Sequence, residues 1–207
     1  NVVRFLLAAF FWGILFLVSY RMWRSTSDRR HLYFSVSAAV GASRELFMFT
    51  AEYGSFRGYI SYPVIFRYYP PIEHSVETLS IVLMGYAFIR FYFNFDRFSR
   101  LFLIGSSVIT ALTYIVIAPT WANFLDLSIK ASLTGGPFIG AQFHSFPGDL
   151  VFRIIGVIVT LLILSSFLYA HNKSIKVPWL AFCAFLLFFF DHGLQGVNDL
   201  CNDRYAP

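Results

Sequence analysis

The stretch LFLIGSSVITALTYIVIA (residues 101–118) contains no charged side chain over its 18 residues. A helix needs about 20 predominantly apolar residues to cross the ~30 Å hydrocarbon core of a bilayer, so an uncharged run of this length predicts a transmembrane helix. Similar apolar runs recur on both sides of it and are separated by short clusters of charge. The sequence therefore predicts an all-α fold, a polytopic transmembrane helix bundle.

The composition of the chain agrees with a membrane protein. Of 207 residues, 57% are hydrophobic, 20% are aromatic and only 13% are charged, whereas soluble domains average about 25% charged residues. The net charge of +5 does not indicate nucleic-acid binding, because the basic residues lie at the ends of apolar runs and form no continuous basic face. We expect the lipid bilayer to be the main partner, with no nucleic acid.

Six helices are predicted within a single transmembrane domain, residues 1–207. Their ranges are 2–23, 31–53, 72–93, 101–118, 149–171 and 177–197. The Gly- and Pro-containing segment 119–148 is predicted to be a long outer loop. The second range is rich in Ser, Ala and Gly, which favour close helix packing in lipid. Because apolar sequence begins almost at once and the last run is followed by only a short tail, we expect the chain to be part of a longer protein.

The basic residues predict the orientation of the bundle. They are concentrated in the turns at 21–30, 90–100 and 173–176, and the connections on the opposite side carry fewer. Cytoplasmic loops of membrane proteins carry an excess of Lys and Arg. We therefore expect a multi-pass protein of the bacterial cytoplasmic (plasma) membrane with its N-terminus outside.

Ionisable side chains inside the predicted spans fall in the outer half of the membrane. Each costs roughly 2.5–3.5 kcal/mol on insertion scales, so each one needs a reason. Arg44 and Glu45 point to different sides of their helix and are expected to have different partners, while Asp149 and Arg153 are four residues apart and can pair. The candidate ligand-binding residues are Arg44, Glu45, Glu77, Arg153, Asp191 and His192. The alternative is that these are structural ion pairs that fix helix register.

A metal or haem site is a second interpretation of the same region. Imidazole and carboxylate groups are ligands that Zn or Fe accepts, and two histidines at matching depth could hold a haem. The candidate metal or haem residues are His74, Glu77, Asp191 and His192. No paired motif such as HExxH is present, so we expect no cofactor while haem and metal stay open. No catalytic motif is visible, which leaves open whether the protein has enzymatic activity.

Three short segments carry a family resemblance. They are REL at 44–46, PPIEH at 70–74 after a Gly- and Pro-containing loop, and YAF at 86–88 at the end of the third predicted helix. Together they resemble the seven-transmembrane N-terminal sensor regions of bacterial histidine kinases and related signalling proteins. The resemblance implies an outside N-terminus, a seventh helix beyond residue 207, a cytoplasmic output module and a role in signal transduction.

The leading hypothesis is therefore a membrane sensor whose outer-half polar cluster binds a ligand or a proton. An alternative is an accessory or electron-transfer subunit of a larger membrane complex, with a haem, metal or quinone near His74 and His192. A small-solute transporter is a third hypothesis, weakened by the scarcity of polar residues in the cytoplasmic half. Further membrane subunits or a second copy of the chain are expected partners.

Overall fold

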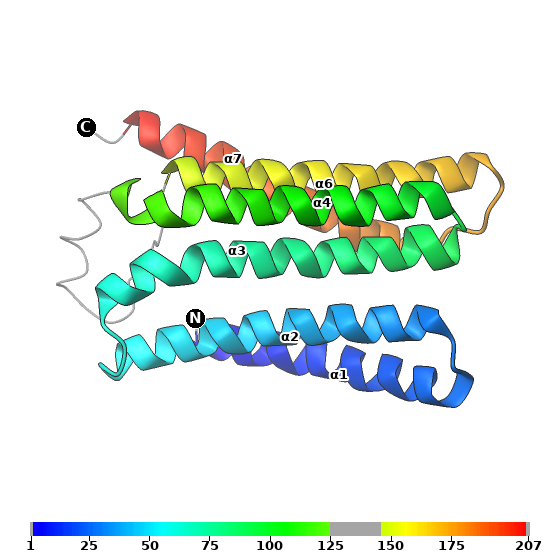
Figure 1. Cartoon of the computed structure of the whole chain (residues 1–207), viewed down its shortest axis with the longest axis horizontal. Helices are drawn as coiled ribbons and strands as arrows, with labels where there is room; N and C mark the ends of the chain where they lie inside the picture. Colours follow the sequence, from blue (N-terminus) through cyan, green and yellow to red (C-terminus); the bar gives the residue numbers. More distant parts are fainter. Residues whose placement is uncertain (1, 125–145, 206–207) are drawn as a thin grey trace.

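Long helices lie lengthwise beside one another in the computed structural model, which describes residues 2–124 and 146–205 (Figure 1). They are α1 (Val2–Thr26), α2 (Arg29–Phe56), α3 (Tyr62–Ala87), α4 (Asp96–Ile117), α6 (Phe146–Asn172) and α7 (Trp179–Tyr205). A π-helix, η1 (Phe88–Tyr92), follows α3, and a 3-10 helix, η2 (Ala118–Phe124), follows α4. The predicted all-α bundle is confirmed. Most of the predicted outer loop at 119–148 lies outside the described residues.

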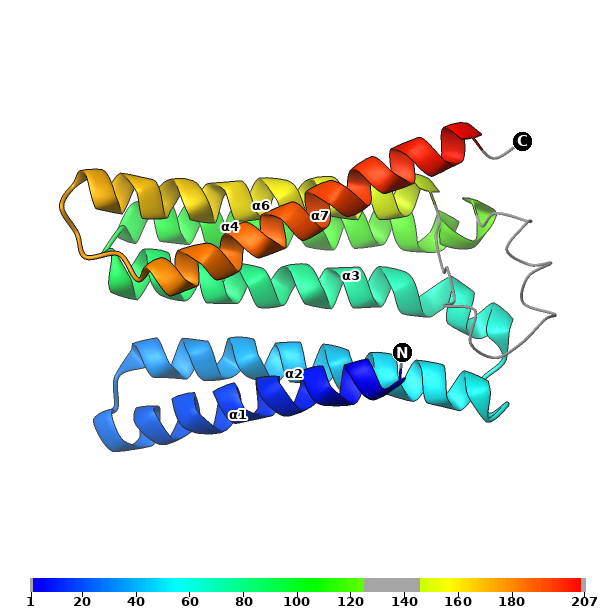
Figure 2. The same cartoon turned by 180° about the vertical axis from the view of Figure 1, so that it is seen from behind.

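The helices alternate in direction, and α3 occupies the middle of the bundle. The pair α1 and α2 lies on one side of α3, while α4 and α6 lie on the other, and α7 crosses obliquely over these helices on the far face (Figures 1 and 2). The α1–α2, α3–α4 and α6–α7 turns all lie at one end of the bundle. We call it the basic end. Its basic residues are Arg21, Arg24, Arg29, Arg30, Arg90, Arg97, Arg100, Lys173 and Lys176.

Five of the helical segments are long and apolar enough to cross a membrane. They are Val3–Thr26, Tyr68–Tyr92, Asp96–Trp121, Gly148–Asn172 and Trp179–Val197. The predicted sixth span, α2, is less apolar because it carries Arg44, Glu45 and Glu52 among many small residues. However, α1 ends at the basic end and α3 begins at the opposite end, so α2 crosses the same thickness between them (Figure 1). We infer that α2 spans the membrane too, as the polar helix of the bundle.

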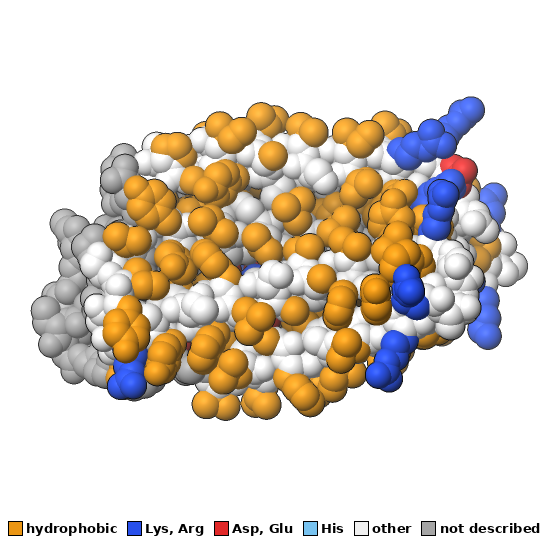
Figure 3. All heavy atoms as spheres, turned by 60° about the horizontal axis from the view of Figure 1, so that its bottom comes forward, with side chains coloured by type: hydrophobic (Ala, Val, Ile, Leu, Met, Phe, Trp, Pro, Cys, Tyr) orange, Lys and Arg blue, Asp and Glu red, His pale blue; other side chains and the backbone are white. Residues whose placement is uncertain are grey.

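Apolar side chains cover the outside of the bundle as well as its core. Leu101 is 72% exposed and Leu180 is 88% exposed, and Figure 3 shows hydrophobic side chains along the visible face with Lys and Arg gathered at the basic end. The core lies between α3, α6 and α7, where Val82, Ile163 and Phe167 are fully buried. An exterior this apolar suits contact with lipid rather than water.

Small residues let α2 pack closely against its neighbours, as the sequence predicts. The Ser37 hydroxyl donates to the Ser80 carbonyl on α3 (2.9 Å), and the Ser80 hydroxyl donates to the Ser37 carbonyl (3.2 Å). On the other side, a Cβ on Gly41 would lie 2.7 Å from the Trp12 ring of α1, closer than packed carbon atoms come. These contacts fix the position of α2 between α1 and α3.

The third helix begins earlier than the sequence predicts, at Tyr62 rather than at residue 72. Pro70 and Pro71 lie inside it, although proline lacks a backbone N–H and clashes with the preceding turn. Membrane helices tolerate such prolines, and α3 continues through Pro70 and Pro71 to Ala87. Figure 1 shows α3 changing direction in its first turns. The predicted loop therefore shortens to the few residues between Phe56 and Tyr62.

Each turn at the basic end contains one non-glycine residue in the left-handed region. These are Ser27 (φ 55°), Asn94 (φ 59°) and Ser174 (φ 58°), a conformation that commonly ends helices. Asp28 then caps α2, because its carboxylate accepts from the Arg30 backbone N–H (2.9 Å) and from Arg30 Nε (2.7 Å). These hydrogen bonds from Arg30 lower the pKa of Asp28. The basic end is thus closed by short, defined turns.

Candidate functional site

Charged side chains from four helices meet inside the bundle, in the half away from the basic end. Arg153 lies five residues inside the span Gly148–Asn172, and His192 lies five residues before the end of the span Trp179–Val197. At 1.5 Å per residue both are about 8 Å from that end of their apolar spans, and Glu77, nine residues after Tyr68, is about 14 Å from the same end of its own span. We call the cluster the ion network. Its members are Arg44, Glu45, Glu73, His74, Glu77, Asp149, Arg153 and His192.

Arg44 links α2 to α3. Its Nη1 is 2.6 Å from Glu45 Oε1 on its own helix. Its Nη2 pairs with Glu73 and lies 3.4 Å from Glu77 Oε1, both on α3. The planar guanidinium suits several carboxylates at once, because its five donors point in fixed directions. The Glu45 residue is only 5% exposed, so Arg44 satisfies a carboxylate that would otherwise be stranded in an apolar interior.

His74 links α3 to α6 and has a carboxylate on each side of its ring. Its Nε2 is 2.7 Å from Asp149 Oδ1, and its Nδ1 is 4.0 Å from Glu77 Oε2. Phe152 stacks on the ring at 5.4 Å between centroids, and Trp121 of η2 lies at 5.9 Å. His74, Asp149 and Trp121 are all buried. The aromatic side chains therefore shield the His74–Asp149 hydrogen bond from its surroundings.

Glycine at position 148 allows Trp121 to reach this place. A Cβ there would lie 2.5 Å from the Trp121 ring, a distance at which the ring would have to move. The fully buried Trp121 side chain thus rests on the first turn of α6, directly beside the His74–Asp149 pair. The end of α4 is packed against the ion network by this contact.

Arg153 links α6 to both α3 and α7. Its Nη1 is 4.0 Å from Glu77 Oε2 and 3.3 Å from His192 Nδ1. A guanidinium can only donate, so Nδ1 of His192 accepts in this contact, which requires a neutral ring with its proton on Nε2. A protonated His192 would present an N–H to the guanidinium. Protonation of His192 and the Arg153–His192 contact are therefore mutually exclusive in this geometry.

The His192 ring is held against the backbone of α6. It is 3% exposed, and a Cβ on Gly156 would lie 2.7 Å from its Cδ2. Its Nε2 is buried and has no hydrogen-bond partner among the described residues. An unsatisfied buried donor costs about 1–3 kcal/mol. The ring is thus closely packed but incompletely bonded.

The network contains more carboxylates than cations. Among the described residues, the four carboxylates Glu45, Glu73, Glu77 and Asp149 are grouped with two guanidiniums, those of Arg44 and Arg153. Fully ionised carboxylates would leave an excess of negative charge in a low-dielectric interior, which is strongly unfavourable. The two imidazoles and the carboxyl groups themselves can remove that excess by holding protons.

The structure brings together five of the six predicted ligand-binding residues. The ion network contains Arg44, Glu45, Glu77, Arg153 and His192. The sixth, Asp191, is exposed on α7, and its carboxylate accepts a hydrogen bond from Gln195 Nε2 at 2.7 Å. The expectation that Arg44 and Glu45 have different partners is wrong, because the long Arg44 side chain reaches back to the adjacent carboxylate.

Two members of the network were not among the predicted site residues. Glu73 is four residues before Glu77, so the two share one face of α3, and this spacing was the signal that could have included it. The sequence spacing predicts a pair between Asp149 and Arg153 on one helix, and the structure shows Asp149 in contact with His74 across helices. Sequence spacing alone gives no information about such cross-helix contacts.

The predicted metal or haem residues do not form a metal site. Among the described residues, no three His, Cys, Asp or Glu side chains are grouped so that they could hold a metal ion. Both ring nitrogens of His74 face carboxylates, and Nε2 of His192 faces Gly156. Neither imidazole therefore directs a free nitrogen toward a space in which haem iron could sit.

Comparison of the chain with family models, with curated proteins and with solved structures finds no match. The functional conclusion therefore depends on the geometry of the ion network in this membrane-embedded helix bundle.

Proposed function

We propose that the chain is a membrane-embedded sensory region in which the ion network is a proton-binding site. Protons entering or leaving the network change the contacts among α2, α3, α6 and α7, and the change in helix packing is the signal. The basic end lies in the cytoplasm and the N-terminus outside, in keeping with the excess of Lys and Arg in the basic-end turns. The resemblance to seven-transmembrane sensor regions supports a cytoplasmic output beyond this chain.

The observation that carries the proposal is the excess of carboxylates over guanidiniums in a buried cluster. Buried ionised groups without partners shift toward their neutral forms. The number of protons held by the network therefore follows the pH of the outer solution. A purely structural set of ion pairs would be expected to balance its charges, as in a one-to-one pairing of each carboxylate with a cation.

His192 provides the step from protonation to helix movement. In the described geometry its neutral ring accepts from Arg153. Once protonated, it is repelled by the guanidinium and attracted by Glu77, which Arg153 also contacts. The contact between α6 and α7 then loses its polar link, so α7 can change its tilt against α6. A two-state change of this kind is how local charge events produce global responses.

The test is proton uptake by the full chain in lipid nanodiscs. Infrared difference spectra between neutral and acidic pH should contain a protonated carboxyl C=O band, and Glu77→Gln should weaken or shift it. Asp191→Asn is the matched control, because this carboxylate lies in the same membrane half but is exposed and bonded to Gln195. A spectrum that Glu77→Gln leaves unchanged, or that only Asp191→Asn alters, would contradict the proposal.

The helix movement has its own measurement. Spin labels at Leu46 on α2 and Leu194 on α7, both exposed, would be placed in a chain with Cys183 and Cys201 replaced by serine. The distance distribution between the labels should change with pH in the parent and stay fixed in His192→Gln. If protons were taken up without any change in the distance between the labels, the ion network would still be a proton-binding site. The proposal that it signals by helix movement would be refuted.

A further inference from the structure

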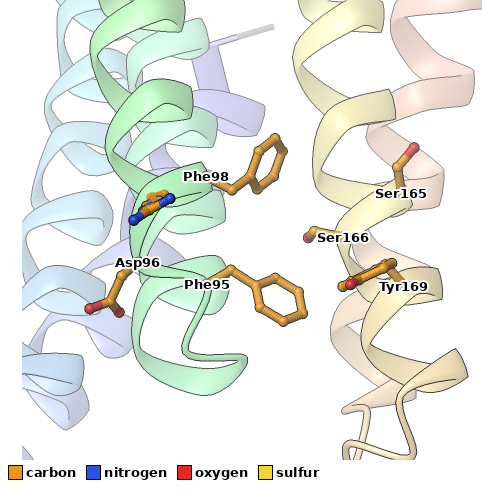
Figure 4. A pocket seen from close by; sticks show the side chains of 7 residues that line it. Phe95, Asp96, Phe98, Ser165, Ser166 and Tyr169 are labelled. Carbon is orange, nitrogen blue, oxygen red and sulfur yellow. The ribbon is translucent and has the colours of Figure 1, made fainter.

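A groove runs along the lipid-facing side between α4 and α6, starting at the basic end. Its wider part is a cavity of about 480 Å³. Phe95 and Phe98 line it from the α4 side, and Ser165, Ser166 and Tyr169 line it from α6 (Figure 4). Phe98 and Tyr169 are exposed at the surface of the bundle, so the cavity opens to the side.

A second cavity of about 160 Å³ lies farther along the same pair of helices, away from the basic end. It lies between the same two helices, with Phe102 and Ser106 of α4 and Val159 of α6 as buried lining residues. Gly105 leaves it open, since a Cβ there would meet nothing within 4 Å. From Arg97 to Ile109, the helix residues that line the groove cover about 18 Å, which matches one leaflet of a ~30 Å hydrocarbon core.

The two ends of the groove differ in chemistry. The deeper end is apolar, whereas the end at the basic end of the bundle carries the Arg97 side chain. Asp96 also lines the wide cavity, but its carboxylate is paired with Arg90. None of the ion pairs found among the described residues involves Arg97. The Arg97 end of the groove therefore offers an unneutralised cation above an apolar channel.

We propose that this groove binds an acidic phospholipid, with one acyl chain between α4 and α6 and the headgroup phosphate at Arg97. Lipid is the occupant that the surroundings favour, because both helices cross the membrane and the groove opens toward the bilayer. An anionic headgroup complements the charge of Arg97. The groove is separate from the ion network, so a negative result for lipid binding would not affect the proton-sensing proposal.

Native mass spectrometry of the delipidated full chain tests the headgroup. Dioleoyl phosphatidylglycerol should bind about fivefold more tightly than dioleoyl phosphatidylcholine, the preference expected from one basic side chain near an anionic headgroup. Arg97→Gln should remove the preference, and Arg24→Gln, which changes a basic residue on α1 at the same end, should keep it. Equal binding of both lipids, or equal loss in both variants, would indicate only general attraction and would overturn the proposal.

Filling the groove with a larger side chain tests whether an acyl chain occupies it. Gly105→Leu should reduce phosphatidylglycerol binding several-fold, because the side chain enters the open space at this position without a clash. Gly13→Leu is the control, since a Cβ on Gly13 of α1 also meets nothing within 4 Å and the position lies away from the groove. Glycerol phosphate, which has the headgroup charge without the chains, should not compete. Undiminished lipid binding in Gly105→Leu, with both variants folded by circular dichroism, would refute the groove as the site.

Discussion

Replacement of Gly156 by alanine should break the contact between α6 and α7 at the ion network. The new Cβ would lie 2.7 Å from His192 Cδ2 and 2.9 Å from Nε2, whereas packed heavy atoms stay about 3.5 Å apart or more. The His192 ring must therefore move about 0.8 Å away from α6. Arg153 lies on α6, so Nδ1 of His192, now 3.3 Å from Arg153 Nη1, would move out to about 4 Å, beyond hydrogen-bond range.

The expected cost follows from two unfavourable effects and one favourable effect. Overpacking of a buried site costs about 1–3 kcal/mol, and a hydrogen bond to a charged group contributes about 1.5–3 kcal/mol. Alanine in place of glycine stabilises a helix interior by at most about 1 kcal/mol. We expect Gly156→Ala to reduce the free energy of unfolding by about 2 kcal/mol and to diminish the pH response of the infrared spectrum.

The matched control for this change is Gly193→Ala, on α7 beside His192. A Cβ on Gly193 meets nothing within 4 Å, so the same chemical change should be neutral or slightly stabilising. Unfolding in mixed micelles, titrated with sodium dodecyl sulfate, measures both variants. If Gly156→Ala were as stable as Gly193→Ala and kept the parent pH response, the role given to the His192 packing would be refuted.

Three further changes test the contact between Arg153 and Glu77, the orientation in the membrane and the cap of α2. Arg153→Leu should destabilise the bundle by about 3 kcal/mol, because it removes one of the two guanidiniums that contact the buried Glu77 carboxylate. The double variant with Glu77→Leu should recover at least about 1 kcal/mol of that loss in the same unfolding titration, and simple additivity would contradict the cross-helix pair. An impermeant thiol reagent on intact cells should label Tyr59→Cys but not Ser27→Cys, and the reverse pattern would overturn the orientation. Asp28→Ala should lower the free energy of unfolding by about 1 kcal/mol at neutral pH through loss of the α2 cap. Because the pKa of Asp28 is lowered in the folded chain, this difference should be present above pH ~4 and vanish as the carboxyl protonates in stronger acid. A difference that is independent of pH would argue against the cap.

The fold class could be predicted from the sequence because each apolar run is about as long as the membrane is thick. The uncharged stretch 101–118, for example, falls inside the span Asp96–Trp121. The start of α3 could not be predicted in the same way, since Pro70 and Pro71 usually mark a helix boundary. Whether a helix continues through prolines depends on how neighbouring helices pack against it in the membrane, and the sequence of the helix itself does not contain that information.

The candidate site was predicted in part. Depth along each helix was enough to gather Arg44, Glu77, Arg153 and His192 into one membrane half. The facing direction of α7 was not predictable, because apolar residues surround most of that helix and its periodicity favours no side. Asp191 and His192 are adjacent, yet one is exposed and the other is buried against Gly156. That distinction depends on how α7 crosses α6 (Figure 2).

The shallow position of the ion network has a consequence for the electric potential across the membrane. At a membrane potential of 100 mV, moving one elementary charge across the whole membrane changes its energy by about 2.3 kcal/mol. A proton that enters from the end opposite the basic end and stops at Glu77 travels about 14 Å of a ~30 Å core, and it therefore experiences less than half of that voltage. At the depth of Arg153 and His192, about 8 Å, the share falls to about 0.6 kcal/mol per 100 mV. Protonation at His192 should therefore follow the acidity of one aqueous phase with only a weak dependence on the membrane potential, whereas protonation of Glu77 should depend on that potential about twice as strongly.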